Sequence, residues 1–384
     1  MIAMSDAGAL PTGVRSRMID HVNGLRMHAL EAGDPAAPCV LLLHGFPEIA
    51  YSWRKILPRL ATAGYYAVAP DLRGYGRTAT QRTAFDEDLA PYRMTNRLVD
   101  MLSLVATLGR QQVALVGHDY GSWVAGYCAL ARPDVFASLT LMSAPFAGAP
   151  SLADLPISLL APVEDPIHAA LAALARPRKH YHAYYATESA AADMDGPEQR
   201  VAAFLRAYFH HKSADWTGNA PRALPGWTAE ALAEMPTYYI MDRDRTMPQT
   251  VAPEMPTDGG VSCPWLTEAE LSVYAREYAR TGFQGALQGY RCRLDGSLAR
   301  DLGMFAGCHV EVPTQFISGR QDWGPFQGPG ALTRMQTVAC PSMEGCTLLE
   351  GAGHWVQQEQ ADQVAELLTK FLAKFLAKFL GRPG

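Results

Sequence analysis

The feature that most constrains the fold is a set of short apolar runs that alternate with helical stretches up to about Pro145. Each run is continuous, which is typical of strands buried on both faces of a parallel sheet. The runs cover residues 40–43, 65–69, 113–116 and 139–142. Between two of them, residues 97–108 carry apolar side chains at helical spacing. The alternation predicts a mostly parallel α/β sheet with helices on both faces.

The remaining segments extend this sheet and interrupt it. Residues 18–30 predict a β-hairpin around Asn23-Gly24, and two more apolar runs cover 315–317 and 347–349. From Pro145 to about Leu294 the chain is helical and aromatic-rich without a convincing buried strand, and the strand pattern resumes at Pro313. This helical block indicates a lid over the carboxyl edge of the sheet. The expected division is 1–147 for the first part of the core, 148–294 for the helical lid and 295–384 for the second part of the core.

Residues 370–380 repeat Lys, Phe, Leu and Ala so that Phe and Leu form adjoining stripes of an amphipathic helix. We expect this helix to pack on the sheet as the last element of the core. The alternative is a basic helix that binds a membrane surface or a second copy of the chain.

Composition excludes several classes of protein. The formal net charge is -5 and no basic block precedes residue 370, so nucleic acid is not an expected partner. The seven cysteines are scattered without C-x-x-C spacing, and no stretch of about 20 apolar residues occurs. We expect no cofactor, metal ion or membrane span, a cytoplasmic location, a small-molecule partner, and a monomer or homodimer.

The motif that carries chemistry is Gly117-His118-Asp119-Tyr120-Gly121, which follows the run at 113–116 and precedes a helix over 122–131. Strand, tight glycine turn and helix form a nucleophile elbow. The residue at its apex is an aspartate where an esterase has serine. A carboxylate that attacks an alkyl carbon forms an ester, which activated water can open, whereas serine would form a stable ether. The elbow therefore predicts alkyl transfer followed by ester hydrolysis.

Two further residues complete a triad in the chain order of this architecture. Asp322 follows the run at 315–317, and His354 follows the run at 347–349. Because Asp119 needs no base to ionise it, His354 is free to activate water. The backbone N–H groups of Phe46 and Tyr120 are the expected oxyanion hole.

These motifs resemble the α/β-hydrolase-fold epoxide hydrolases. The resemblance is carried by His44-Gly45-Phe46-Pro47-Glu48 with Trp53, by Asp71 to Gly76, by the elbow, and by Asp322 and His354. It implies conversion of an epoxide and water to a vicinal diol through a covalent ester on Asp119. It also implies two lid tyrosines that bind the epoxide oxygen, Tyr181 and Tyr290, with Tyr184 as the alternative to Tyr181. His44, Pro47 and Trp355 are the expected substrate contacts.

Two features depart from the family pattern. Gly289 stands where many relatives carry an aromatic residue beside the tyrosine, which predicts a more mobile Tyr290 or a wider pocket. The lid also contains a long excursion over 215–264. Glu48 is either an orienting residue near the oxyanion loop or a packing residue.

Competing interpretations share parts of this pattern. A haloalkane dehalogenase uses the same triad logic, but it stabilises a halide, usually with a tryptophan N–H where Tyr120 stands here. A non-catalytic binding protein would not need His354, and a serine esterase would need its serine at the apex instead of Ser122. The epoxide hydrolase is the preferred hypothesis.

Overall fold

A computed structural model describes residues 10–151, 165–258, 263–296 and 301–380, with side chains described up to residue 374. Its centre is an eight-stranded sheet in the order β1-β2-β4-β3-β5-β6-β9-β10. The strands are β1 (Arg15–Val22), β2 (Leu25–Ala32), β3 (Cys39–Leu43), β4 (Tyr66–Pro70), β5 (Val113–His118), β6 (Phe136–Met142), β9 (Thr314–Gly319) and β10 (Met343–Leu349).

The first three strands in this order pair antiparallel, and every later pair is parallel. The β1–β2 turn has positive φ at Asn23 (48°) and Gly24 (76°), the conformation that a tight hairpin requires. β3, β4 and β5 are buried along their whole length, as their continuous apolar runs predict. The predicted hairpin and mostly parallel sheet are therefore confirmed.

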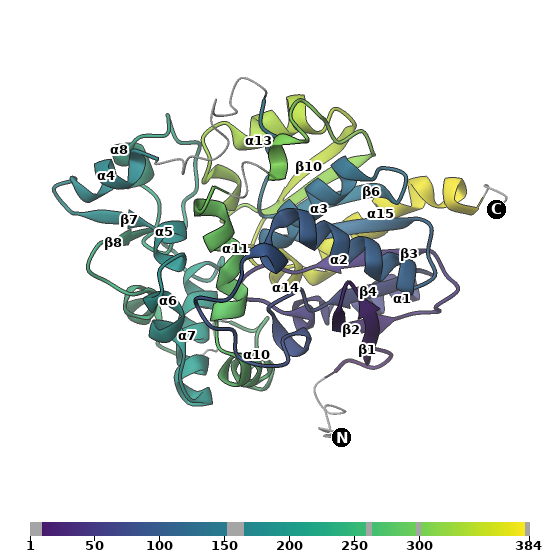
Figure 1. Ribbon diagram of the computed structural model, residues 1–384, viewed down its shortest axis with the longest axis horizontal. Coiled ribbons are helices and arrows are strands. Elements are labelled where there is room, and N and C mark those ends of the chain that lie inside the picture. The colour runs from purple at the N-terminus through teal and green to yellow at the C-terminus, as the bar shows by residue number, and fades with distance from the viewer. Residues whose placement is uncertain (1–9, 152–164, 259–262, 297–300, 381–384) are drawn as a thin grey trace.

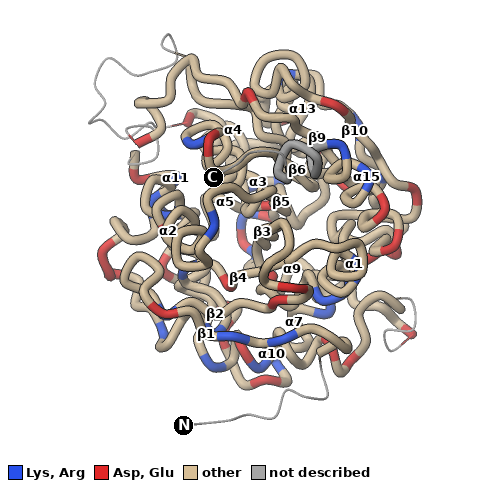
Figure 2. The backbone as a smooth tube through the Cα atoms, turned by 90° about the vertical axis from the view of Figure 1, so that its right-hand side faces the viewer, with Lys and Arg blue, Asp and Glu red and all other residues tan. Residues whose placement is uncertain are grey.

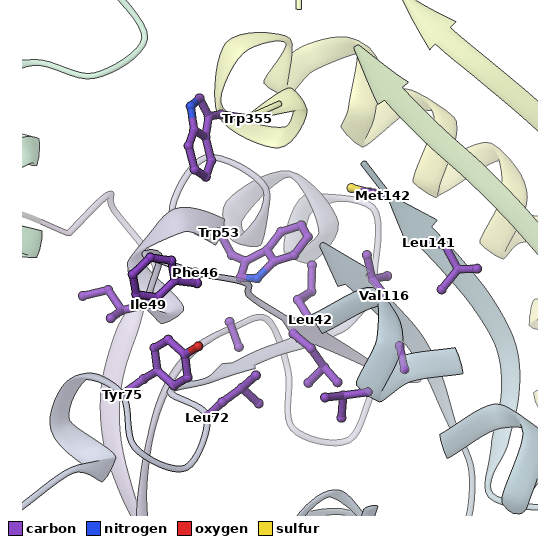
Figure 3. Close-up of a cluster of buried hydrophobic side chains, with 14 of the residues drawn as sticks. Leu42, Phe46, Ile49, Trp53, Leu72, Tyr75, Val116, Leu141, Met142 and Trp355 are labelled. Atoms are coloured by element: carbon purple, nitrogen blue, oxygen red, sulfur yellow. The ribbon is translucent and has the colours of Figure 1, made fainter. Parts of the chain in front are cut away.

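Helices of the core cover both faces of the sheet. On one face α2 packs against α3, which lies in front of the sheet in Figure 1. A second helix pair of the core is formed by α1 and α15, which contact each other. The core helices are α1 (Leu57–Thr62), α2 (Met94–Thr107), α3 (Tyr120–Ala131), α13 (Ala331–Arg334), α14 (Val356–Glu359) and α15 (Ala361–Leu380). Figure 3 shows apolar side chains from the sheet and its loops, among them Leu42, Trp53 and Val116, packed beneath the carboxyl ends of the strands.

The chain between β6 and β9 gathers to one side of the sheet, at the left of Figure 1. Its helices are α4 (Ile167–Ala172), α5 (Tyr181–Tyr185), α6 (Ser189–Met194), α7 (Glu198–His211), α8 (Ala229–Leu232), α9 (Met247–Val251), α10 (Glu268–Thr281) and α11 (Gln284–Leu294). The expectation that this region holds no strand was wrong. β7 (Arg178–His180) and β8 (Ile240–Asp242) form an antiparallel pair, too short to produce a recognisable period in the sequence. Asp242, the last residue of β8, pairs with Arg176 and Arg178.

The C-terminal repeat continues α15. The buried residues of this helix include Val364, Leu368, Phe371 and Leu372, so its first turns pack on the core as expected. The side chains of the later repeats lie outside the described residues.

Charged residues of both signs are spread around the periphery of the backbone in Figure 2. No helix in the described ranges is long and apolar enough to span a bilayer. None of the seven cysteines forms a disulfide, and the described residues contain no group of His, Cys, Asp and Glu suited to hold a metal ion.

Candidate active site

Asp119 stands at a sharp turn between β5 and α3. Its backbone has φ 52° and ψ -119°, a region that non-glycine residues rarely adopt, so the surrounding structure must impose it. The two flanking glycines allow the turn. A Cβ on Gly117 would lie 2.3 Å from the carbonyl oxygen of Gly121, and one on Gly121 would lie 2.4 Å from that of Leu43. The turn therefore projects Asp119 beyond the end of the sheet.

The structure brings Asp119, His354 and Asp322 together. Nε2 of His354 lies 3.3 Å from Oδ2 of Asp119, and Nδ1 lies 3.1 Å from Oδ1 of Asp322. Asp322 is held in turn by the Ser318 hydroxyl at 2.9 Å and by the Gly324 N–H at 2.7 Å. His354 and Asp322 are each about 1% exposed. The arrangement orients one imidazole between two carboxylates.

The other oxygen of Asp119 faces the loop after β3. The Phe46 N–H donates to Oδ1 of Asp119 at 3.0 Å, where the sequence predicts one half of the oxyanion hole. A Cβ on Gly45 would lie 2.3 Å from that same oxygen, so glycine is required for this close approach. Tyr120, the other expected donor, is the first residue of α3.

The electrostatics of the site favour an ionised nucleophile. Burial acts to raise the pKa of Asp119, but the neighbouring imidazole of His354, with Lys212 and His118, outweighs it and holds that pKa below its ordinary value. Burial likewise acts against ionisation of Asp322, and the charge of His354 again lowers the pKa of that carboxyl. Both carboxylates therefore carry a negative charge at neutral pH.

Two of the predicted lid tyrosines meet near Asp119. The ring centroids of Tyr181 and Tyr290 lie 6.1 Å apart. Burial is the largest cause that raises the pKa of each phenol, and the negative charge of Asp119 raises it further. The Tyr181 hydroxyl donates to Oε1 of Gln327 at 3.0 Å, whereas the Tyr290 hydroxyl makes no hydrogen bond within the described part of the chain. Tyr184, the alternative candidate, donates to Asp193 in the lid instead.

The three expected substrate contacts have structural partners. His44 is fully buried and uses both ring nitrogens on backbone, accepting from the Leu72 N–H and donating to the Gly45 carbonyl. Trp355 is also fully buried, and its indole N–H donates to the Phe209 carbonyl at 2.8 Å. Pro47 is buried in the same loop as His44. The ring nitrogens of His44 therefore hold two neighbouring loops, and the indole of Trp355 holds helix α7. That these residues contact the substrate stays a prediction.

Comparison with known proteins shows which family has a sequence and fold similar to those of this chain. Residues 38–361 match the α/β hydrolase fold family. Epoxide hydrolase B of Mycobacterium tuberculosis is 32% identical over 355 residues, 90% of this chain and 94% of the relative. The chain belongs to the α/β-hydrolase-fold epoxide hydrolases. Among solved structures, an epoxide hydrolase from an endophytic Streptomyces has a TM-score of 0.74 at 33% identity, covering 94% of this chain and 96% of that one. Epoxide hydrolase A from Mycobacterium thermoresistibile has a TM-score of 0.72 at 29% identity, covering 94% and 98%.

Membership of the epoxide hydrolase family confirms the resemblance carried by the sequence motifs, and the structure adds a buried ion pair behind them. Nδ1 of His118 lies 2.7 Å from Oε2 of Glu48, and Nε2 of His118 lies 2.8 Å from the carbonyl oxygen of His354. A carboxylate and a carbonyl only accept hydrogen bonds, so both nitrogens of His118 carry a proton and the ring is cationic. Glu48, whose role the sequence left open, is fully buried and orients the residue beside the nucleophile.

The space left by Gly289 is filled by Tyr120. A Cβ on Gly289 would lie 2.8 Å from the Tyr120 hydroxyl and 3.0 Å from the adjoining ring carbon. The rings of Tyr120 and Tyr290 lie 6.3 Å apart. The missing aromatic residue of the family pattern is therefore compensated by the tyrosine that follows the nucleophile.

Sequence reasoning missed the contacts that fasten the lid to the catalytic loop. The His354 N–H donates to the carbonyl of Lys212, at the end of α7, at 2.9 Å. The side-chain carboxyl group of Glu359, whose pKa burial raises to about 8, accepts from the N–H groups of Gly353, Trp355 and Ala214 at 2.8 to 2.9 Å. Glu359 therefore joins both sides of His354 to the lid, and no local sequence pattern signals this contact.

Proposed function

We propose that the chain hydrolyses epoxides to vicinal diols through a covalent ester on Asp119. The observation that carries the proposal is the pair of contacts on the Asp119 carboxylate, with the Phe46 N–H on one oxygen and the imidazole of His354 near the other. A carboxylate nucleophile can attack carbon directly, and a neighbouring histidine then activates the water that opens the ester. The relatives named epoxide hydrolase support the same chemistry.

In the first step, an oxygen of Asp119 bonds to an epoxide carbon and the ring C–O bond breaks. The released oxygen develops negative charge, and the phenols of Tyr181 and Tyr290 donate hydrogen bonds to it. Tyr290 has no competing acceptor among the described residues, whereas Tyr181 exchanges Gln327 for the substrate.

In the second step, His354 takes a proton from water, whose oxygen bonds to the ester carbonyl carbon of Asp119. The resulting oxyanion is stabilised by the backbone N–H groups of Phe46 and Tyr120. Collapse breaks the bond to the diol oxygen, which receives the proton held by His354. The second proton of the water passes from the new carboxyl group to the alkoxide formed in the first step, so that the diol is complete and Asp119 returns as a carboxylate. Asp322 holds the imidazole and stabilises its charged form.

The lid boundaries at 148 and 294, a cytoplasmic location and a small-molecule epoxide as partner belong to the same proposal. The absence of a disulfide among the seven cysteines supports a reducing setting. The oligomeric state, monomer or homodimer, stays a prediction.

The test is turnover of styrene, aliphatic and terpene epoxides with chiral analysis of the diols. We expect diol from the wild type and none from Asp119→Ala. Bromoalkanes serve as the discriminating substrate, because halide release without diol formation from any epoxide would favour a haloalkane dehalogenase and contradict the proposal.

The tyrosines are tested in the same assay. Tyr290→Phe and Tyr181→Phe each remove one donor to the developing alkoxide, so the first step should slow by about 10²-fold. Tyr185→Phe is the matched control, because that ring lies 5.0 Å from Tyr290 but its hydroxyl bonds to Tyr208. Equal rates in all three variants would contradict the assignment of the two donors.

A further inference from the structure

Lys212 is a cation in an unusual position. It is only 2% exposed, and its ammonium makes no hydrogen bond within the described residues. Instead it lies over four aromatic rings. The centroids are 4.8, 5.3, 5.3 and 5.7 Å away for Tyr239, Tyr208, Trp355 and Tyr238. Burying a charge is costly unless other groups stabilise it, so the position of this lysine calls for a reason.

The rings around Lys212 also contact the reacting groups. Trp355 packs edge-on against His354 with centroids 4.7 Å apart, and Tyr239 lies 5.2 Å from Tyr181. The backbone of Lys212 is fixed as well, because its carbonyl accepts from the His354 N–H. The ammonium is therefore held at a set place beside the triad.

The charges that favour the protonated form of Lys212 are those of three carboxylates, Asp119, Asp322 and Glu48. The cation of His118 is already paired with Glu48 at 2.7 Å. Among the described residues Lys212 is thus a cation without a paired carboxylate, and its charge acts on both carboxylates of the triad.

The charge on Asp119 changes during the proposed reaction. Formation of the ester removes it, and hydrolysis restores it when water bonds to the carbonyl carbon, His354 takes a proton and the bond to the diol oxygen breaks. A fixed cation stabilises the oxyanion and the carboxylate of the second step. The same cation stabilises the nucleophile before the first step, so it does not assist alkylation.

We propose that Lys212 is a positioning residue whose fixed positive charge favours hydrolysis of the Asp119 ester over its formation. This inference rests on the proposed function. It assigns to the lid an electrostatic part in the second half of the reaction, in addition to the tyrosines that serve the first half.

The ionisation of Lys212 gives the proposal a pH signature. Burial lowers the pKa of Lys212 to about 8, and the three carboxylates act in the opposite direction. The titratable groups that face it are Asp119, Asp322, Glu48, Tyr208, Tyr238, Tyr239, His182 and His211. As the pH rises through about 8, Lys212 loses its proton and the hydrolysis step should slow.

The experiment separates the two steps by rapid quenching and mass spectrometry of the ester and the diol. In Lys212→Met, which keeps the length but not the charge, we expect hydrolysis about tenfold slower and alkylation no slower. The fraction of protein present as ester therefore rises, and the decline above about pH 8 seen in the wild type is absent. Lys179→Met is the matched control, since Lys179 lies 4.8 Å from the Tyr184 ring but faces Asp193 and Asp244.

Equal rate constants for both steps in the wild type and Lys212→Met overturn the inference about Lys212. If ester and diol still form in these proteins, the proposed function is left intact. Neither ester nor diol in the wild type overturns the proposed function itself. Should Lys212→Met fail to fold, the wild type decides, because a hydrolysis rate that does not fall between about pH 7 and 9 overturns the role of Lys212.

Discussion

Gly289 and Tyr120 come from segments far apart in the chain but share one space beside Tyr290. Gly289 lies inside α11, where alanine would ordinarily stabilise a helix by up to about 1 kcal/mol. Here the added Cβ meets the Tyr120 hydroxyl at 2.8 Å, and such crowding costs roughly 1–3 kcal/mol. The clash should outweigh the helix preference.

We therefore expect Gly289→Ala to lower the free energy of unfolding by about 1 kcal/mol. In a Tyr120→Phe background, which removes the hydroxyl but leaves the ring carbon 3.0 Å away, the same change should cost less. Urea unfolding of the four proteins measures the coupling. Gly345→Ala, where nothing lies within 4 Å of the new Cβ, is the control for a glycine replacement without a clash. Additive effects at positions 289 and 120 would contradict the shared space.

At the scale of the elements, the ion pair of Glu48 and His118 links the loop after β3 to the end of β5. Burial opposes both charges, yet the partner lowers the pKa of Glu48 and raises the pKa of His118. A lowered acid pKa contributes stability above its ordinary 4.5 that is lost as the pH falls through the folded value. A raised histidine pKa contributes stability below its ordinary 6.5 that is lost as the pH rises through the folded value.

The contribution of this pair to stability should therefore be greatest between about pH 4.5 and 6.5. Glu48→Gln should lower the free energy of unfolding by about 3 kcal/mol, because it leaves a buried cation without its carboxylate. It should also flatten the decline in stability above pH 6.5. Urea unfolding from about pH 4 to 9 checks both effects. Glu344→Gln, on the exposed pair with Lys374, should change neither.

Local sequence patterns predicted the elements that carry strong periodicity. β3 and β5 follow from their continuous apolar runs, and the elbow follows from its glycines. The β7–β8 pair was missed because three-residue strands are too short to show a period. The bond from Tyr181 to Gln327, and the placement of Lys212, depend on contacts between distant segments, which a single sequence does not encode locally.

At the scale of the whole molecule, the lid and the core meet at the side-chain carboxyl group of Glu359. It accepts hydrogen bonds from the backbone N–H groups on both sides of His354 and from that of Ala214 in the lid. Glu359→Ala leaves three donors without their acceptor and should lower the free energy of unfolding by about 3 kcal/mol or more. Glu359→Gln keeps one acceptor oxygen and should cause a smaller loss. Urea unfolding measures these losses. Equal losses of unfolding free energy in the two Glu359 variants, or losses no larger than that of Glu344→Gln, would contradict this attachment of lid to core.

The central claim is that Asp119 forms a covalent ester that His354 removes through water. It is tested most directly by the intact mass of His354→Gln after incubation with an epoxide that the wild type converts. We predict an added mass equal to that of the epoxide, located on the peptide that contains Asp119 and absent from His354→Gln with Asp119→Ala. A folded His354→Gln protein that never gains this mass, while the wild type forms diol, would contradict the account.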